Sequence, residues 1–153
     1  MAVIIKKSEL NDYVGYQTEP TPWHKVTQQQ INQFAACTLD EQFIHVDPER
    51  AKDTPFGTTI AHGFLTLSML ARFSEQYKVL IEGFYMGINS GFDKVRFLAP
   101  VLVNSHIRAV AKVLEIAETK PGQFRIKTEV TVEIQGSDKP ALVAEWIGIQ
   151  MTA

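Results

Sequence analysis

Two different spacings of apolar residues divide the chain into helical and extended parts. Between Thr27 and Thr38, four apolar side chains recur with the spacing of a helix that buries one face: Ile31, Phe34, Ala35 and Cys37. Thr27 and Gln30 stand three residues apart, as in a capping box. Val26 and Ile31 flank them at the positions of a hydrophobic staple. We therefore predict a helix that begins after Thr27 and ends at about Thr38.

Two more helices are predicted further along the chain. Asp47 is a suitable N-cap and Pro48 a favoured first helical residue, so a short helix is expected to begin there. A longer helix is expected from His62–Gly63 to about Tyr77. Its apolar residues leave almost no polar face: Phe64, Leu65, Leu67, Met69, Leu70, Ala71 and Phe73. Such a helix is buried on nearly all sides, so the rest of the chain must wrap it.

The second half of the chain has the two-residue period of strands. Apolar and polar residues alternate from Arg125 to Gln135, which predicts a long strand with one buried and one solvent-facing side. Turns are expected before it at Pro121–Gly122 and after it at Gly136–Asp138. Further strands are expected near residues 84–97, 103–118 and 141–151. Three or four such antiparallel strands form a meander, and its natural partner is the apolar helix, which makes an α+β fold.

Composition narrows the class of protein. With 153 residues, 45% of them hydrophobic, the chain fits one domain over residues 1–153 that folds without disulfides or a structural metal. Fifteen basic and seventeen acidic residues give a net charge of −2, which argues against a nucleic-acid partner. The single cysteine, Cys37, favours a reducing compartment, and we expect it in helix packing rather than as a nucleophile. The sequence contains neither a membrane-length apolar stretch nor a secretory signal, so we expect a soluble cytoplasmic protein with no membrane partner.

The most informative polar segment runs from Asp40 to His45. A carboxylate and a neutral imidazole brought to one point can hold a water molecule between two acceptors. One of them can then take a proton from the water while the other returns a proton to the substrate. Five residues of non-helical chain can fold both side chains into one cleft. In the structural alternative, Asp40 caps or ends a helix and His45 is a satisfied structural histidine.

A second segment, Ile60–Gly63, opens the apolar helix. Gly63 at a helix N-terminus exposes backbone N–H groups that would stabilise an acyl carbonyl oxygen as it becomes an enolate. Alternatively, this glycine allows close packing of the helix on a strand, and His62 is a capping or core residue. His45 and His62 match none of the usual metal-binding spacings, so we expect no metal. No cofactor is expected either, since the sequence has no local phosphate-binding loop.

Other catalytic motifs are missing from the sequence. It contains no glycine-rich dinucleotide or Walker loop and no Gly-x-Ser-x-Gly nucleophile elbow. Lys94 and Arg96, in the strand expected over residues 84–97, fit either a phosphate contact or an ordinary solvated face.

From Asp40 to Ala51 the sequence DEQFIHVDPERA resembles the MaoC-like dehydratases and (R)-specific enoyl-CoA hydratases, above all the branch named after nodulation protein N. Three further stretches extend the resemblance, in the same order, over most of the chain: Trp23 with residues 31–36, Ile60–Phe64, and Lys94–Phe97 with Pro100–Val101. The resemblance implies the hot-dog fold, in which an antiparallel sheet curls around one long helix. It also implies a homodimer.

The resemblance further implies a substrate and a site. The substrate would be an acyl thioester carried by coenzyme A or acyl carrier protein. In the family, residues matching Asp40 and His45 act on the catalytic water, and the glycine matching Gly63 gives its backbone N–H to the thioester oxygen. Three further residues are expected to contact the substrate: Gln42, Phe43 and Phe64.

A few positions depart from the broad hydratase motif. Leu39 stands where that motif has glycine, and it can shift the loop backbone that aims Asp40. Gln42 and Phe43 replace asparagine and proline, as they do in the nodulation-type branch. A serine found in the central helix of some hydratases falls at Ala71, so that role is not carried over.

Three functions follow from these residues. The first is reversible hydration of a trans-2-enoyl thioester to the (R)-3-hydroxyacyl thioester, a hydro-lyase reaction. The second keeps the fold and hydrolyses the thioester, but hydrolysis does not need the paired His45. The third is a non-catalytic module that binds acyl thioesters, which Leu39 and the absent helix serine leave open.

Overall fold

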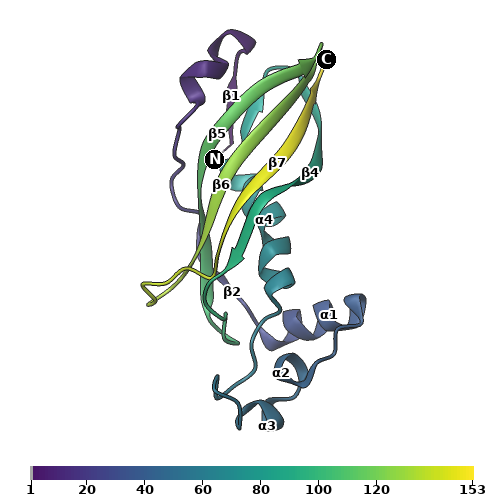
Figure 1. Ribbon diagram of the computed structural model, residues 1–153, viewed down its shortest axis with the longest axis vertical. Helices are drawn as coiled ribbons and strands as arrows, with labels where there is room; N and C mark the ends of the chain where they lie inside the picture. Colours follow the sequence, from purple (N-terminus) through teal and green to yellow (C-terminus); the bar gives the residue numbers. More distant parts are fainter. Residues whose placement is uncertain (1) are drawn as a thin grey trace.

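A five-stranded antiparallel sheet and one long helix dominate the computed structural model, which describes residues 2–153. Figure 1 shows the long strands curling together, with α4 (Gly63–Tyr77) running along one side of them. The sheet order is β2-β5-β6-β7-β4. The strands are β2 (His24–Lys25), β5 (His106–Lys120), β6 (Gln123–Ile134), β7 (Leu142–Thr152) and β4 (Phe84–Phe97). The predicted hot-dog arrangement of class α+β is confirmed.

The strand order differs from a simple meander. Strands β5, β6 and β7 follow one another through short turns, as predicted. Strand β4 comes before β5 in the sequence but pairs with β7 instead, from Phe84 opposite Thr152 to Phe97 opposite Leu142. The alternation predicted for β6 is present, since Phe124 and Val132 are fully buried while the residues between the buried positions are partly exposed. Strand β4 consequently forms an edge of the sheet.

Helix α4 begins and ends where the sequence predicted, and it buries one face against the sheet. The buried residues of this face are Leu65, Thr66, Met69, Leu70, Phe73 and Tyr77. The prediction that the helix is covered on nearly all sides is wrong for the single chain. Phe64 is 66% exposed, and Ser68 and Ala71 are exposed as well. One curled sheet covers only one side of a helix, so this second face of α4 stays open.

The α-helices that precede α4 in the chain lie at the end of the molecule where α4 begins (Figure 1). They are α1 (Gln28–Thr38), α2 (Phe43–Val46) and α3 (Pro48–Ala51). The predicted cap of α3 is confirmed, because the Asp47 carboxylate accepts from the Arg50 N–H at 3.1 Å. Helix α2 was not predicted. It shows that the segment up to His45 is partly helical rather than extended loop.

The predicted start of α1 is confirmed, but only half of its capping box forms. The Thr27 hydroxyl accepts from the Gln30 N–H at 3.2 Å. The Gln30 side chain points elsewhere, to the His24 ring at 2.9 Å and to the Met69 sulfur at 3.2 Å. The two staple residues, Val26 and Ile31, are both buried in the main core, as expected.

The prediction for Cys37 is wrong, because this side chain is exposed. Helix α1 buries Ile31 and Ala35, which lie one turn apart on the same face. Cys37 comes two residues after Ala35 and therefore points to the opposite side of the helix, where its thiol donates to the Phe34 carbonyl.

A second, smaller core lies at the other end of the sheet. There β1 (Val3–Ile5) pairs in parallel with β3 (Val79–Ile81), and the helical turn η1 (Lys7–Tyr13) packs beside them. Across residues 2–153, no helix is both long and apolar enough to cross a membrane.

Candidate active site

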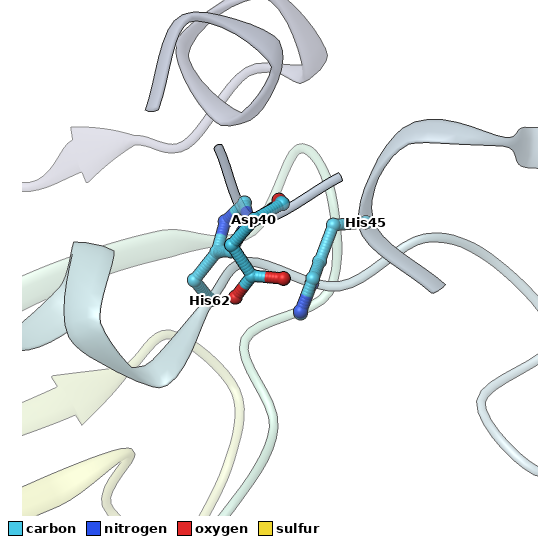
Figure 2. Close-up of side chains that lie close together, drawn as sticks. All are labelled: Asp40, His45 and His62. Atoms are coloured by element: carbon cyan, nitrogen blue, oxygen red, sulfur yellow. The ribbon is translucent and has the colours of Figure 1, made fainter. Parts of the chain in front are cut away.

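Asp40, His45 and His62 come together at the N-terminal end of α4 (Figure 2). Asp40 lies in the loop after α1, His45 lies on α2, and His62 is the residue before α4. One side-chain ligand atom from each residue lies within 4.8 Å of the others. The structure therefore brings together the carboxylate and the imidazole that the sequence singled out.

The Asp40 loop leaves α1 through Leu39. This residue caps the helix in the left-handed conformation, with φ 62° and ψ 21°, and its side chain is 86% exposed. Glycine is the residue that adopts this conformation most readily. Leu39 thus adopts the backbone conformation that a glycine at this position favours.

His45 is buried, and one ring nitrogen has a fixed partner. Nδ1 lies 2.7 Å from the Ile60 carbonyl oxygen, which can only accept a hydrogen bond. Nδ1 therefore carries the proton in the neutral ring, and Nε2 is left as an acceptor. Burial lowers the pKa of His45, although the hydrogen bond to Ile60 acts in the opposite direction. The ring is neutral near pH 7, as a proton acceptor must be.

His62 contacts both members of the pair. Its ring stacks on that of His45, with centroids 3.8 Å apart and planes inclined by 23°. Its Nε2 donates to the backbone carbonyl of Asp40 at 2.9 Å. The other nitrogen, Nδ1, is buried and has no hydrogen-bond partner within residues 2–153.

The same three side chains offer the atoms that a metal ion would need. The lone pairs of imidazole nitrogens lie in the ring plane, so two nearly parallel stacked rings direct them side by side rather than to one point. One nitrogen of each ring is also engaged by a backbone carbonyl. The arrangement suits proton exchange with a small molecule better than joint coordination of an ion.

Gly63 lies beside this group, at the first turn of α4. The side chain of the N-cap residue, His62, makes no hydrogen bond to the first-turn N–H groups. A Cβ atom at Gly63 would lie 3.1 Å from the Phe97 ring. Gly63 and His45 line a common cavity of about 300 Å³ with Ala61, Thr66 and Val101 among its other walls. A carbonyl oxygen placed there meets a helix N-terminus.

The three residues expected to contact substrate are not among those that line this cavity. Gln42 is exposed at the start of α2. Phe43 is half-buried, and the Arg50 guanidinium lies over its ring at 4.2 Å. Phe64 projects from α4, with its ring edge-on to that of Phe97.

Gln28 is a site residue that sequence reasoning missed. From the first turn of α1, its amide nitrogen donates to the His45 carbonyl at 2.7 Å. Its amide oxygen accepts from the hydroxyl of Thr59, which is fully buried. Gln28 therefore ties α1 to α2 and to the segment that leads into α4. Its only signal in the sequence was its place at a helix start.

A second cavity, of about 290 Å³, lies further along α4. Ala71, Ser74 and Tyr77 form the helix side of it, and the sheet contributes Thr128 and Trp146. Most of the lining is apolar. The Tyr77 hydroxyl and the Trp146 indole N–H are buried without a partner in the described part of the chain. Burial raises the pKa of Tyr77, so its hydroxyl stays protonated.

Comparison with known proteins agrees with this fold. The family described as "MaoC like domain" matches residues 10–136. The chain is 44% identical over 140 residues to 3-hydroxyacyl-thioester dehydratase Z of Mycobacterium tuberculosis, covering 92% of each. It is 44% identical over 138 residues to nodulation protein N of Rhizobium leguminosarum bv. viciae, covering 89% of this chain and 85% of that protein. The solved (R)-hydratase from A. caviae superposes with a TM-score of 0.71 at 25% identity, covering 88% of this chain and 94% of the other.

A curled sheet around one helix, together with relatives named as dehydratases and hydratases, defines a hydro-lyase with the hot-dog fold. The chain belongs to the MaoC-like family. The predicted similarity to the branch of nodulation protein N is confirmed, since two nodulation N proteins match it at 40% and 44% identity.

Proposed function

We propose that this chain catalyses the reversible hydration of a trans-2-enoyl thioester to the (R)-3-hydroxyacyl thioester. One observation carries the proposal: a neutral imidazole with a free Nε2, close to a carboxylate, opens on the same cavity as a helix N-terminus. Water, a proton acceptor and an oxygen-binding site are the three requirements of this reaction.

The chemistry follows from the positions of Asp40, His45 and Gly63. A water molecule held between the Asp40 carboxylate and His45 Nε2 loses a proton to the pair as its oxygen bonds to C3 of the substrate. The electron pair of the C2–C3 double bond moves towards the thioester carbonyl, whose oxygen gains enolate charge. The Gly63 N–H donates to that oxygen. A proton from the pair then reaches C2, so one water has been added and the pair is restored.

Asp40 and His45 act here as one unit. Two interacting titratable groups share macroscopic pKa values, so the roles of acid and base belong to the pair. The relative named 3-hydroxyacyl-thioester dehydratase Z supports an acyl-thioester substrate, because dehydration is the reverse of the same reaction. A more distant relative, 29% identical over 92 residues, is named (R)-specific enoyl-CoA hydratase and supports the stereochemistry. Coenzyme A and acyl carrier protein are both suitable carriers.

The acyl chain of the substrate is proposed to bind in the second cavity. It lies between the C-terminal half of α4 and the inner face of the sheet. From Gly63 to Ser74 the helix rises about 16 Å, at 1.5 Å per residue. An acyl chain that follows α4 therefore runs away from the reacting carbons towards a largely apolar space.

The active protein is proposed to be a cytoplasmic homodimer of one-domain chains. Apolar side chains are exposed along β4, which is also an edge of the sheet: Tyr85, Met86, Ile88, Phe92 and Phe97. Exposed apolar edges pair with another chain or are covered. A second copy placed there would cover both β4 and the open face of α4.

Hydration of crotonyl-CoA tests the proposal. The wild type should convert it to the (R)-3-hydroxy product, and Asp40→Asn and His45→Gln should each lower kcat by at least about 10²-fold, the usual contribution of positioned acid–base groups. His106→Gln, which changes a histidine on β5, is the matched control and should keep full activity. Hydration that survives both site substitutions contradicts the pair. Release of free thiol without hydration indicates a thioesterase, and tight acyl-CoA binding without turnover indicates a binding module.

A further inference from the structure

His62 contacts three separate parts of the candidate site. Its own position places it next to Gly63, as the N-cap of α4. Its Nε2 donates to the backbone carbonyl of Asp40, and its ring stacks on His45. On the other side, the Phe34 ring packs against it with centroids 4.9 Å apart. The side chain is 2% exposed, so it has little freedom to turn.

We propose that His62 is a positioning residue, which holds the Asp40 carboxylate and the His45 ring in one geometry relative to the Gly63 N–H. This inference rests on the proposed hydration function. The sequence left His62 as a capping or core residue, but it does not cap α4 with its side chain. Its polar contact reaches across the site to the Asp40 loop instead.

The Asp40 loop needs such a contact because its backbone is strained. Leu39, immediately before Asp40, has a positive φ that costs a non-glycine residue free energy. The peptide that follows could relax into an extended conformation, which would move the carboxylate. The hydrogen bond from His62 fixes the Asp40 carbonyl and opposes that relaxation. An error of about 1 Å in such a group can cost on the order of 10²-fold in rate.

The stacked ring also affects the proton affinity of His45. Burial is the main reason that the pKa of His45 is lowered, and His62 lowers it further, while the Ile60 hydrogen bond and Asp40 raise it. Asp40, from the loop after α1, and His62, from the start of α4, are the titratable groups that act on His45. Replacing His62 with an uncharged side chain removes this electrostatic contribution and should therefore raise the pKa of His45.

Two substitutions separate the two contacts. In His62→Gln the amide nitrogen can replace Nε2 as the donor to Asp40, but the ring stack is lost. In His62→Phe the stack remains and the donor is lost. We expect His62→Phe to lower kcat on the order of 10²-fold with KM little changed, and His62→Gln to lose less. His106→Gln serves as the control.

The measurement combines kcat and KM for enoyl-CoA hydration over a range of pH with direct NMR titration of the His45 ring. In both variants the His45 pKa should rise, and the acidic limb of the kcat/KM profile should move to higher pH. Thermal unfolding gives the folded fraction at the assay temperature. Phe34→Leu, which loosens the His62 ring without removing its hydrogen bond, provides a milder variant if the others fold poorly, and it should show a smaller loss of kcat.

The proposal is overturned if the His45 titration and the pH profile match the wild type and the loss of rate equals the loss of folded protein. The proposal is also overturned if Phe34→Leu is the only variant that folds, and its hydration rate and His45 titration both match those of the wild type. If the wild type does not hydrate enoyl thioesters but the variants still shift the His45 pKa, the positioning role stands and the proposed function is wrong.

Discussion

At the scale of single residues, the site depends on how one ring nitrogen is kept free. His45 uses Nδ1 for the Ile60 carbonyl, so Nε2 is the nitrogen left for the proposed proton transfer. Because that partner is a backbone atom, no sequence change at position 60 removes it directly. The orientation of the base is thus set by the path of the chain into α4.

The pH dependence of catalysis follows from the burial of His45, which lowers its pKa. As the pH falls, protonation of Nε2 removes the acceptor, so activity should persist below the ordinary histidine pKa of about 6.5 and then be lost. The unfolded chain binds the proton more readily, so the contribution of His45 to folding stability is present above about pH 6.5 and is lost as the pH falls through its lowered pKa. A pH profile of kcat/KM checks this, and an acidic limb above pH 6.5 would contradict it.

Leu39 offers a direct test of backbone strain. A leucine in the left-handed conformation costs roughly 1–2 kcal/mol, and its exposed side chain contributes little packing. Leu39→Gly should therefore raise the free energy of unfolding by about 1 kcal/mol and leave hydration unchanged. Leu39→Ala keeps the Cβ atom and should give no such gain. Urea unfolding of the three proteins distinguishes them, and a Gly variant no more stable than the Ala variant would rule out strain.

The residues alone made Asp40, His45 and Gly63 candidates, each with a structural alternative, and the sequence resemblance assigned their roles. Neither could predict the stack of His62 on His45 or the bridge from Gln28. These contacts depend on how α1, α2 and α4 meet, and side chains from positions so far apart in the chain carry no local signal. The prediction that Cys37 is buried failed for a different reason. Its apolar character did not reveal which face of α1 is buried.

At the scale of elements, helix α4 has two ends with different chemistry. Its N-terminus meets the site at Gly63, and its C-terminal half meets the largely apolar second cavity. The bounds of this helix and the strand period of β6 were readable from the sequence because each pattern is long and local. The pairing of β4 with β7 was not, since strand partners are chosen across the chain.

Gly63→Ala tests the role of the helix N-terminus. The new Cβ would lie 3.1 Å from the Phe97 ring and would crowd the N–H that is proposed to receive the thioester oxygen. We expect the helix to form as before and kcat/KM for enoyl-CoA hydration to fall about tenfold or more.

The double variant Gly63→Ala with Phe97→Ala removes the contact with the ring. The loss of kcat/KM should persist in it, because the crowded N–H remains. Full recovery of the rate would show that the Phe97 contact, rather than the oxygen-binding role, explains the single variant.

At the scale of the whole molecule, the open edge at β4 predicts self-association. Tyr85 and Ile88 on this strand are 61% and 48% exposed. Replacing both with glutamate should convert the proposed dimer to monomers, because two charges would have to be buried at the interface. Sedimentation velocity measures the outcome.

The matched control for the dimer changes two exposed apolar residues outside β4. Ile4 and Val14 lie on β1 and after η1, and they are 73% and 46% exposed. Replacing both with glutamate should leave the dimer intact. A dimer that survives the β4 substitutions, or dissociates equally in the control, excludes this edge as the interface.

The position of β4 also bears on how the chain acquires its structure during synthesis. Phe84 pairs with Thr152, near the end of the last strand, so β4 leaves the ribosome well before its partner β7 exists. Until β7 has been synthesised, the edge of β4 that later pairs with it and the apolar face of α4 have no partner to pack against. Contacts so distant in sequence slow folding and leave aggregation-prone surfaces exposed. Expression at lower temperature or with chaperones should therefore improve the yield of folded protein more than a change of solution pH.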